Sequence, residues 1–83
     1  MNIVAPRIRA AIARSGRTQK EIAAELTISE SYLSDICNGR RAVSAFVAVR
    51  LEAVLDVDAH KLMIDQSLFE LRQARAEYDR VMV

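Results

Sequence analysis

The twenty residues Gln19–Asn38 (QKEIAAELTISESYLSDICN) constrain the fold of this chain more than any other segment. Apolar residues recur in them at the spacing of an amphipathic helix, in two groups with a short break between: Ile22, Ala23 and Leu26, then Leu33 and Ile36. Ile28 lies in the break, where its side chain can join the two apolar faces. Ala23 is small enough for two short helices to cross closely beside it. The segment therefore predicts a helix, a tight turn and a second helix.

Local signals place the ends of both predicted helices. Thr18 followed by Glu21 matches a capping box, in which each side chain accepts a hydrogen bond from the other residue's backbone amide. Ser29 is a suitable N-cap for the second helix, because its hydroxyl can accept a bond from an unpaired amide of the first turn. Gly39, directly after the segment, can adopt the left-handed conformation that ends a helix.

This pattern is typical of a helix-turn-helix motif, whose second helix lies in the DNA major groove. The stretch from Thr18 to Arg41, with TQ, then IAA, then S-x-x-x-L-S-x-I-x-N-G, resembles the Cro/cI (XRE-like) repressors. The resemblance implies a five-helix, lambda-repressor-like DNA-binding domain, here with a long C-terminal helix. The scarcity of glycine, proline and β-branched runs agrees with an all-α chain. A small helical bundle without a nucleic-acid partner is the alternative that the spacing leaves open.

Three further helices are expected around the motif. The first begins at Pro6, a favourable first-turn residue, and ends at Gly16. Its inward residues are Ile8, Ala11, Ile12 and Ser15, and its outward residues are Arg7, Arg9 and Arg14. The three arginines form either a solvated face or neighbours of DNA phosphates. The fourth helix of the chain follows Ser44, a plausible N-cap, and runs to Leu55, with Val47, Leu51, Val54 and Leu55 as its core face.

The last predicted helix is capped by Asp58 and runs from Ala59 to about Arg80. Its expected apolar stripe consists of Leu62, Leu68, Leu71, Ala74, Tyr78 and Val81, flanked by Ile64 and Phe69. This is more apolar surface than so short a chain needs to close its own core, which indicates a partner. The predicted dimer contacts are Phe46, Leu68, Leu71 and Tyr78; for Phe46, burial in its own core is the equal alternative. The chain is expected to form one domain, 1–83, with a DNA-binding core at 6–57 and the C-terminal helix at 58–83.

The candidate DNA contacts lie on and around the second motif helix. Outward serines and carboxylates there have the size and chemistry to reach base edges. Gln19 begins the first motif helix, where amides and the helix dipole favour a phosphate, and a Gln at this position commonly touches the DNA backbone in the resembled family. Two adjacent guanidinium groups after the second helix can clamp phosphates. The full predicted set is Arg17, Gln19, Ser29, Glu30, Ser31, Tyr32, Ser34, Asp35, Asn38, Arg40 and Arg41.

Three of these residues have open alternatives, and one neighbour departs from the resembled family. Glu30 and Asp35 either help to read bases or only face solvent, and Tyr32 either stacks on the core or donates to a phosphate. Thr27 stands where the family often has glycine, because the turn favours a positive φ. A β-branched residue held there costs about 1–2 kcal/mol, unless the turn has another shape.

From Val43 onward the chain resembles HigA-type antitoxins. VSA, AVRLEAVL, Gln66, then Phe69-Glu70-Leu71 and Ala74-Arg75 match that family's pattern, although Leu62 and Asp65 replace a usual Trp and Leu. This resemblance implies a dimer that represses its own operon at a palindromic double-stranded DNA operator and neutralises an RNA-cleaving toxin.

Composition narrows the function further. Residues 1–50 contain eight Lys/Arg and four Asp/Glu, a net +4, whereas residues 51–83 contain four and seven, a net −3. A basic front and an acidic rear suit a protein whose front meets phosphates and whose rear meets protein. No apolar run reaches the ~18 residues that span a membrane, and the N-terminus lacks the pattern of a signal peptide. A lone cysteine, Cys37, excludes an internal disulfide and fits a reducing cytoplasm; we expect it to be a packing residue.

Two other classes of function compete with the repressor. An enzyme is disfavoured, because the sequence has no His pair, no metal-ligand spacing and no phosphate-binding loop, and His60 is solitary. No cofactor or metal is therefore expected. A protein-interaction module with a degenerate helix-turn-helix fits the near-neutral net charge of +1 and the acids on the second motif helix. A small phage-type regulator without a toxin is the alternative within the repressor class.

Overall fold

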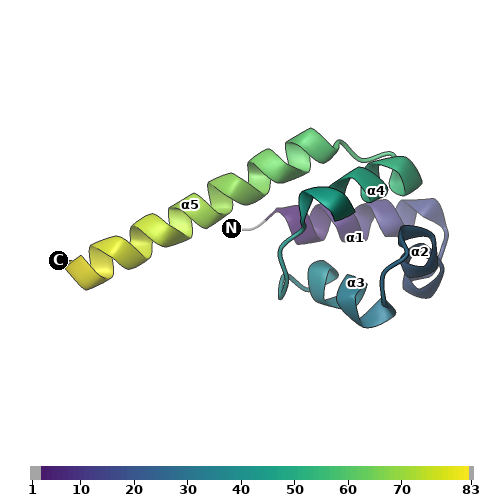
Figure 1. Ribbon diagram of the computed structural model, residues 1–83, viewed down its shortest axis with the longest axis horizontal. Helices are drawn as coiled ribbons and strands as arrows, with labels where there is room; N and C mark the ends of the chain where they lie inside the picture. The colour runs from purple at the N-terminus through teal and green to yellow at the C-terminus, as the bar shows by residue number, and fades with distance from the viewer. Residues whose placement is uncertain (1–2, 83) are drawn as a thin grey trace.

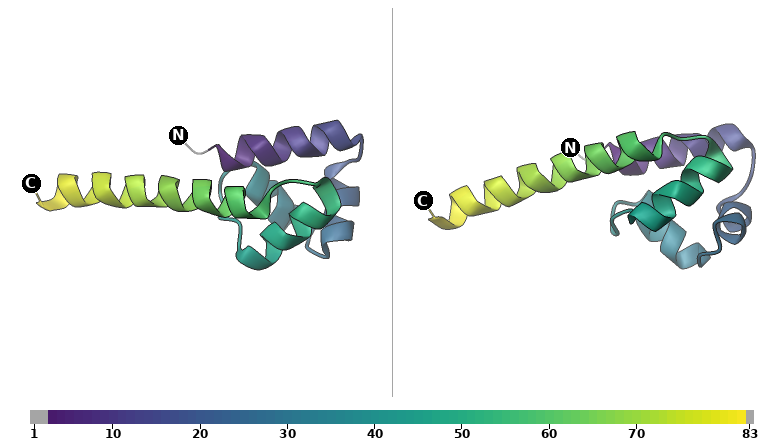
Figure 2. Two further views of the ribbon diagram at one scale, coloured as in Figure 1. Left: turned by 90° about the horizontal axis from the view of Figure 1, so that it is seen from above. Right: turned by 45° about the horizontal axis from the view of Figure 1, so that its top comes forward.

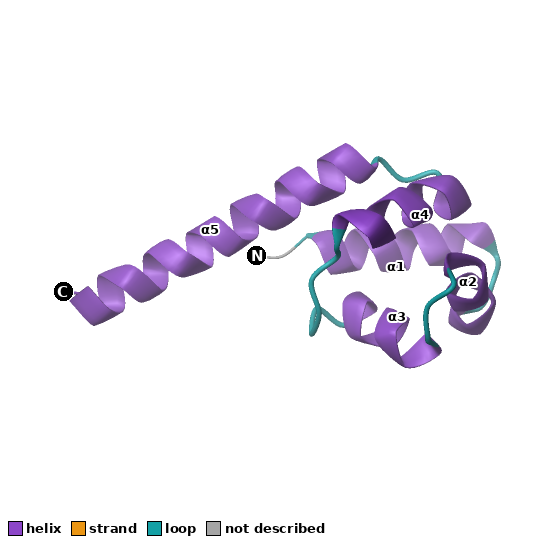
Figure 3. Cartoon of the chain, in the orientation of Figure 1, coloured by secondary structure: helices purple, strands orange, loops and turns teal. Residues whose placement is uncertain are grey.

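The computed structural model describes residues 3–82, all of which lie in five helices or in the short segments that join them (Figure 3). The helices are α1 (Val4–Ser15), α2 (Gln19–Leu26), α3 (Glu30–Cys37), α4 (Ala45–Leu55) and α5 (Ala59–Met82). Helices α1 to α4 form a small bundle, and α5 runs along it and then extends far beyond it (Figure 1). The predicted all-α, five-helix fold is confirmed.

One hydrophobic core joins all five helices. Its fully buried large side chains are Ile8, Ile22, Leu26, Leu33, Ile36, Leu51 and Leu62. The predicted inward residues of the motif belong to this core, and Ala23, at 2% exposure, lies where α2 approaches its neighbours. Val54 and Leu55 are only half-buried and pack against the edge of the core. Leu62 shows that the first turn of the C-terminal helix contributes to the same core as the motif.

Helix α1 begins at Val4, so the prediction that it starts at Pro6 is wrong by two residues. Val4 and Ala5 are buried and extend the apolar face of the helix by half a turn. Proline is tolerated at the third helical position, because its missing amide hydrogen would have no partner within the helix there either. The predicted stop at Gly16 is confirmed, with a left-handed φ of 73°.

Two arginines of α1 make contacts with other helices that the sequence did not predict. Arg7 is half-buried and forms an ion pair with Asp65 of α5. Arg9 donates a hydrogen bond to the carbonyl oxygen of Cys37 at the end of α3. Both side chains therefore bind other helices of the same molecule, and only Arg14 remains exposed without such a contact among the described residues.

Helix α5 buries a different face from the one the sequence predicted. Leu62 is fully buried and Gln66 is 9% exposed, whereas Leu68 and Leu71 are each 46% exposed. At 3.6 residues per turn, Leu68 lies about 120° around the helix from Leu62, and Leu71 lies about 180° from it. The single stripe that combined them is therefore wrong: α5 has a core face and, on its opposite side, a second apolar face.

The far end of α5 has no packing partner within the chain. Every residue from Glu70 to Met82 is exposed, and Figure 2 shows this part of the helix projecting clear of the bundle in both views. None of the helices in residues 3–82 has the length and hydropathy required to cross a membrane.

Candidate nucleic-acid interface

Helices α2 and α3 have the predicted caps. The hydroxyl of Thr18 accepts from the Glu21 amide at 3.1 Å, and the Glu21 carboxylate accepts from the Thr18 amide at 3.0 Å. The Thr18 hydroxyl also donates to the Glu21 carboxylate at 3.1 Å, and the bonds that this carboxylate accepts, first from the Thr18 backbone and then from its hydroxyl, hold the pKa of Glu21 below its usual range. The Ser29 hydroxyl accepts from the Tyr32 amide at 3.0 Å. The capping box and the serine cap are confirmed.

The turn between the two helices places Thr27 in the left-handed region, with φ 56° and ψ 40°. The predicted strained conformation is confirmed. The Thr27 hydroxyl donates to the Leu26 carbonyl oxygen at 2.7 Å, and Arg50 of α4 binds both this hydroxyl and the same carbonyl. Arg50 also lies 3.9 Å from the centre of the Phe46 ring. This arginine, which the sequence did not single out, fixes the turn to α4.

Helix α3 presents a polar face away from the core. Its apolar residues Leu33, Ile36 and Cys37 are buried. Glu30 and Ser31 are exposed at its beginning, and Ser34 and Asp35 are partly exposed one turn further on. In Figure 1, α3 lies on the side of the bundle opposite α5, so the C-terminal helix does not cover this face. The predicted base-reading residues therefore share one accessible surface.

Asp35 is paired within the protein. Its carboxylate accepts from Nε of Arg40 at 3.1 Å, and the Arg40 side chain remains 62% exposed. Asn38 caps the end of α3 by donating from its amide nitrogen to the Ser34 carbonyl oxygen at 2.8 Å. The ion pair offsets the positive charge of Arg40, one of the two predicted phosphate-binding arginines. The carboxylate that does so lies on the polar face of α3, called the recognition face below.

Tyr32 packs on the core, which is one of the two roles considered for it, and it also contacts Arg41. The ring is half-buried and packs against the core. The Arg41 guanidinium lies over the outer face of this ring, 4.7 Å from its centre. Such a cation–π contact orients the arginine while leaving its nitrogen atoms free to donate. Tyr32 thus connects α3 to the basic loop, the segment after α3 that contains Arg40 and Arg41.

Arg17, just before α2, and Gln19, its first residue, differ in how far contacts within the molecule occupy them. Gln19 is half-buried at the first position of the helix. Arg17 binds Glu25 and donates to the Val54 carbonyl oxygen at 3.0 Å. Arg17 therefore makes contacts within the molecule, whereas Gln19 lies at the start of α2 and is partly accessible.

The loop after α3 is held by a buried glutamine of α5. The Val43 amide donates to Oε1 of Gln66 at 2.6 Å, and Nε2 of Gln66 donates to the Val43 carbonyl oxygen at 2.7 Å. The sequence indicated Gln66 only through the antitoxin resemblance and assigned it no role in this loop. A polar residue on the apolar face of a helix was the available signal.

Cys37 is buried at 1% exposure, as expected for a packing residue. Burial raises the pKa of its thiol, against a smaller opposing effect of Arg9. A protonated, buried thiol is a poor nucleophile and a poor metal ligand. No group of side chains within residues 3–82 is arranged to hold a metal ion.

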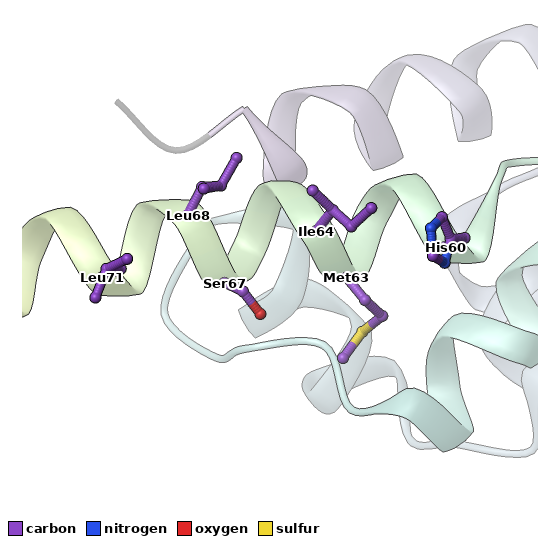
Figure 4. Close-up of a pocket in the computed structure, with 6 residues that line it drawn as sticks. All are labelled: His60, Met63, Ile64, Ser67, Leu68 and Leu71. Atoms are coloured by element: carbon purple, nitrogen blue, oxygen red, sulfur yellow. The ribbon is translucent and has the colours of Figure 1, made fainter.

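The predicted dimer contacts are all exposed, in two places. Phe46 is 63% exposed on α4, so its burial in the core, the alternative expectation, is wrong. Leu68, Leu71 and Tyr78 lie on the second apolar face of α5, together with Ile64. Figure 4 shows an open groove on this face, lined by His60, Met63, Ile64, Ser67, Leu68 and Leu71.

A capped second helix with an uncovered polar face, next to a short turn and a basic loop, defines a helix-turn-helix DNA-binding regulator. The sequence matches the model of the helix-turn-helix family over residues 8–62, and the chain belongs to that family. This match supports the predicted relationship to the Cro/cI repressors.

One similar solved structure is a DNA complex: the crystal structure of PA4674 from Pseudomonas aeruginosa bound to its 28-bp operator. The two chains are 28% identical, with a TM-score of 0.72 over 83% of this chain and 76% of that one. No curated protein matches the chain.

Proposed function

We propose that this protein is a dimeric, sequence-specific transcriptional repressor that binds a palindromic operator in the DNA upstream of its own gene. The observation that carries the proposal is the polar face of α3, which begins with the exposed Glu30 and Ser31 and is followed along the chain by the exposed Arg40 and Arg41. The operator complex of PA4674, to which this fold is similar, supports it. The proposed role is binding, and it involves no catalysis.

The recognition face and the basic loop divide the work of binding. Short polar side chains on α3 can donate to or accept from base edges, which gives sequence preference. Arg40 and Arg41 contact phosphates, which gives affinity that depends on salt but not on sequence. A dimer places two such surfaces about one helical turn of DNA apart, so the operator should consist of two symmetric half-sites.

Footprinting on the upstream DNA tests the proposal. We expect protection of two half-sites, and tighter binding to this duplex than to a shuffled duplex of equal length. Replacing both Arg40 and Arg41 by Ala should weaken binding to both duplexes similarly. The slope of the logarithm of the binding constant against the logarithm of salt concentration should become shallower by about 2. Binding that is equally weak for both duplexes, with no protected site, would instead favour the protein-interaction module.

We infer that the second apolar face of α5 forms the dimer contact. This face lies opposite the core face, and a helix that is apolar on two sides requires two packing partners. Leu71→Glu should shift the protein to the monomer in light scattering at a concentration where the wild type is dimeric. Ala76→Glu introduces the same charge on another side of α5 and is the control. A monomeric wild type, or an unchanged dimer in Leu71→Glu, would contradict this interface.

The resemblance to HigA-type antitoxins supports a finer proposal, that an RNA-cleaving toxin is the protein partner. On this proposal, the toxin should be encoded beside this gene and should co-purify with the protein. If the neighbouring gene encodes no such protein, the chain is instead a small phage-type regulator.

A further inference from the structure

The loop between α3 and α4 has two anchored ends and an exposed middle. At its start, the Gly39 amide donates to the Ile36 carbonyl oxygen at 3.1 Å, and the Arg40 amide donates to the Asp35 carbonyl oxygen at 2.8 Å. At its end, Val43 is 2% exposed and its side chain lies in the core. Both arginines and Ala42 lie between these anchors and are exposed.

Gln66 supplies the second anchor through main-chain atoms. Its side-chain amide accepts from the Val43 amide and donates to the Val43 carbonyl oxygen, at 2.6 and 2.7 Å, and the glutamine itself is 9% exposed. Both backbone groups are buried, so they require partners within the protein. Carboxamide is the side-chain group that offers a donor and an acceptor side by side. Gln66 therefore fixes the position of Val43 and the exit of the loop.

A narrow cleft separates the rest of the loop from α5. Its lining combines Gly39 to Ala42 on the loop with Gln66, Phe69, Glu70 and Gln73 on the helix. The arginine segment therefore stands off α5 and is joined to it at one point, the two hydrogen bonds of Gln66. If those bonds were lost, the loop would lose its polar link to α5 and would be held only by the α3 bonds at its start and the buried Val43 side chain at its end.

We propose that Gln66 is a positioning residue for DNA binding: it holds the loop so that Arg40 and Arg41 reach phosphates when α3 lies in the major groove. This inference rests on the proposed function. A loop that is ordered in advance loses less conformational entropy when it binds, and so binds more tightly. Helix α5 thereby contributes to DNA affinity from a position that does not touch DNA.

The test compares Gln66→Met with Gln73→Met, a matched change at an exposed position in the same cleft. Operator affinity is measured between 50 and 200 mM salt, with helix content and melting temperature recorded for each variant. Gln66→Met should bind more weakly, and its log–log salt dependence should be shallower by up to about 2, which makes its deficit about tenfold larger at 50 mM than at 200 mM. Gln73→Met should behave as the wild type.

A second background separates positioning from general loss of structure. In a protein that already carries Arg40→Ala and Arg41→Ala, Gln66→Met should cause no further loss of affinity, because the side chains it positions are gone. If Gln66→Met fails to fold, Gln66→Glu takes its place, since it keeps the acceptor for the Val43 amide; it should show a smaller loss of the same kind.

Two results overturn the inference. One is a wild-type salt dependence and affinity in the Gln66 variant, and the other is an equal loss with and without the two arginines. If the wild-type protein bound no DNA, the proposed DNA-binding function itself would be wrong. That outcome differs from the two above, in which the wild type binds DNA and only the role of Gln66 is contradicted.

Discussion

At the scale of single residues, Thr27 carries a conformational cost that the sequence alone indicated. A β-branched residue in the left-handed region costs about 1–2 kcal/mol, and glycine avoids most of it. The hydroxyl offsets part of this cost by binding Arg50, although Arg50 also donates to the Leu26 carbonyl oxygen at 2.7 Å and keeps that bond without the hydroxyl.

We therefore expect Thr27→Gly to stabilise the protein by about 0.5–1 kcal/mol, a rise of a few degrees in melting temperature for a domain of this size. Calorimetry or thermal circular dichroism measures the change. Thr27→Ala serves as the control, because it removes the hydroxyl but keeps a Cβ, and it should not be stabilising. A melting temperature that is unchanged or lower in Thr27→Gly would mean that the Arg50 contact outweighs the backbone cost.

Asp35 was predicted to help read bases, and in the structure it is bound to Arg40. One substitution tests both features. Its carboxylate both faces the recognition surface and binds Arg40 at 3.1 Å, so it repels phosphates and restrains a cation. Asp35→Ala should raise affinity for unrelated DNA and lower the ratio of operator to non-operator affinity by about fivefold or more, since one base contact contributes about 1–3 kcal/mol of discrimination.

Competition binding with operator and shuffled duplexes measures that ratio. Glu30→Ala removes a carboxylate at the start of the same helix and shows how much of the effect comes from charge alone. An unaltered ratio in Asp35→Ala would rule out a role for Asp35 in reading sequence.

At the scale of helices, the capping box of α2 makes stability depend on pH. Hydrogen bonds from Thr18 lower the pKa of Glu21 in the folded state. The contribution of this carboxylate is therefore fully present above the ordinary Glu pKa of about 4.3, and it is lost as pH falls through the lower folded value.

Glu21→Gln should accordingly destabilise the protein at pH 7 and flatten the decline in stability below about pH 5. Urea unfolding at a series of pH values measures this. Glu77→Gln, on the exposed end of α5, is the matched control and should leave the decline unchanged. Parallel curves for wild type and Glu21→Gln would show that the cap does not titrate with folding.

The features that could be predicted from sequence are those set by neighbours along the chain. Thr18, Ser29 and Ser44 cap helices as expected, because a cap depends on a residue and the amide three positions later. The outward residues of α3 followed from helical period for the same reason. The contacts that were missed depend on tertiary approach: Gln66 meets Val43 across 23 positions, and Arg7 meets Asp65 across 58. No local pattern specifies such pairs.

At the scale of the whole molecule, α5 joins two functions along one helix. Its first turns complete the core through Leu62 and hold the loop through Gln66, whereas its last turns are wholly exposed. An isolated helix of about a dozen residues is marginal in water, so the exposed end requires a partner to remain ordered.

A chain that ends at Gln73 should therefore keep its fold but form the proposed dimer more weakly, because it loses Tyr78 and keeps Leu68 and Leu71. We expect its melting temperature, measured under conditions where both proteins are monomeric, to lie within a few degrees of the full-length value. Operator affinity should fall, because a smaller fraction of the protein is dimeric and able to bind two half-sites at once. Light scattering and operator titration measure both properties. Unfolding of the shortened chain would mean instead that residues 74–83 support the core itself.

The anchor at Val43 also bears on how the DNA affinity of such a protein can change. Gln66 binds the main chain and leaves side-chain identity in the neighbouring loop unrestricted. Residues 40–42 are exposed, so they can be exchanged without disturbing the scaffold that presents them. DNA affinity and the stability of the fold can therefore change independently, by engineering or by evolution.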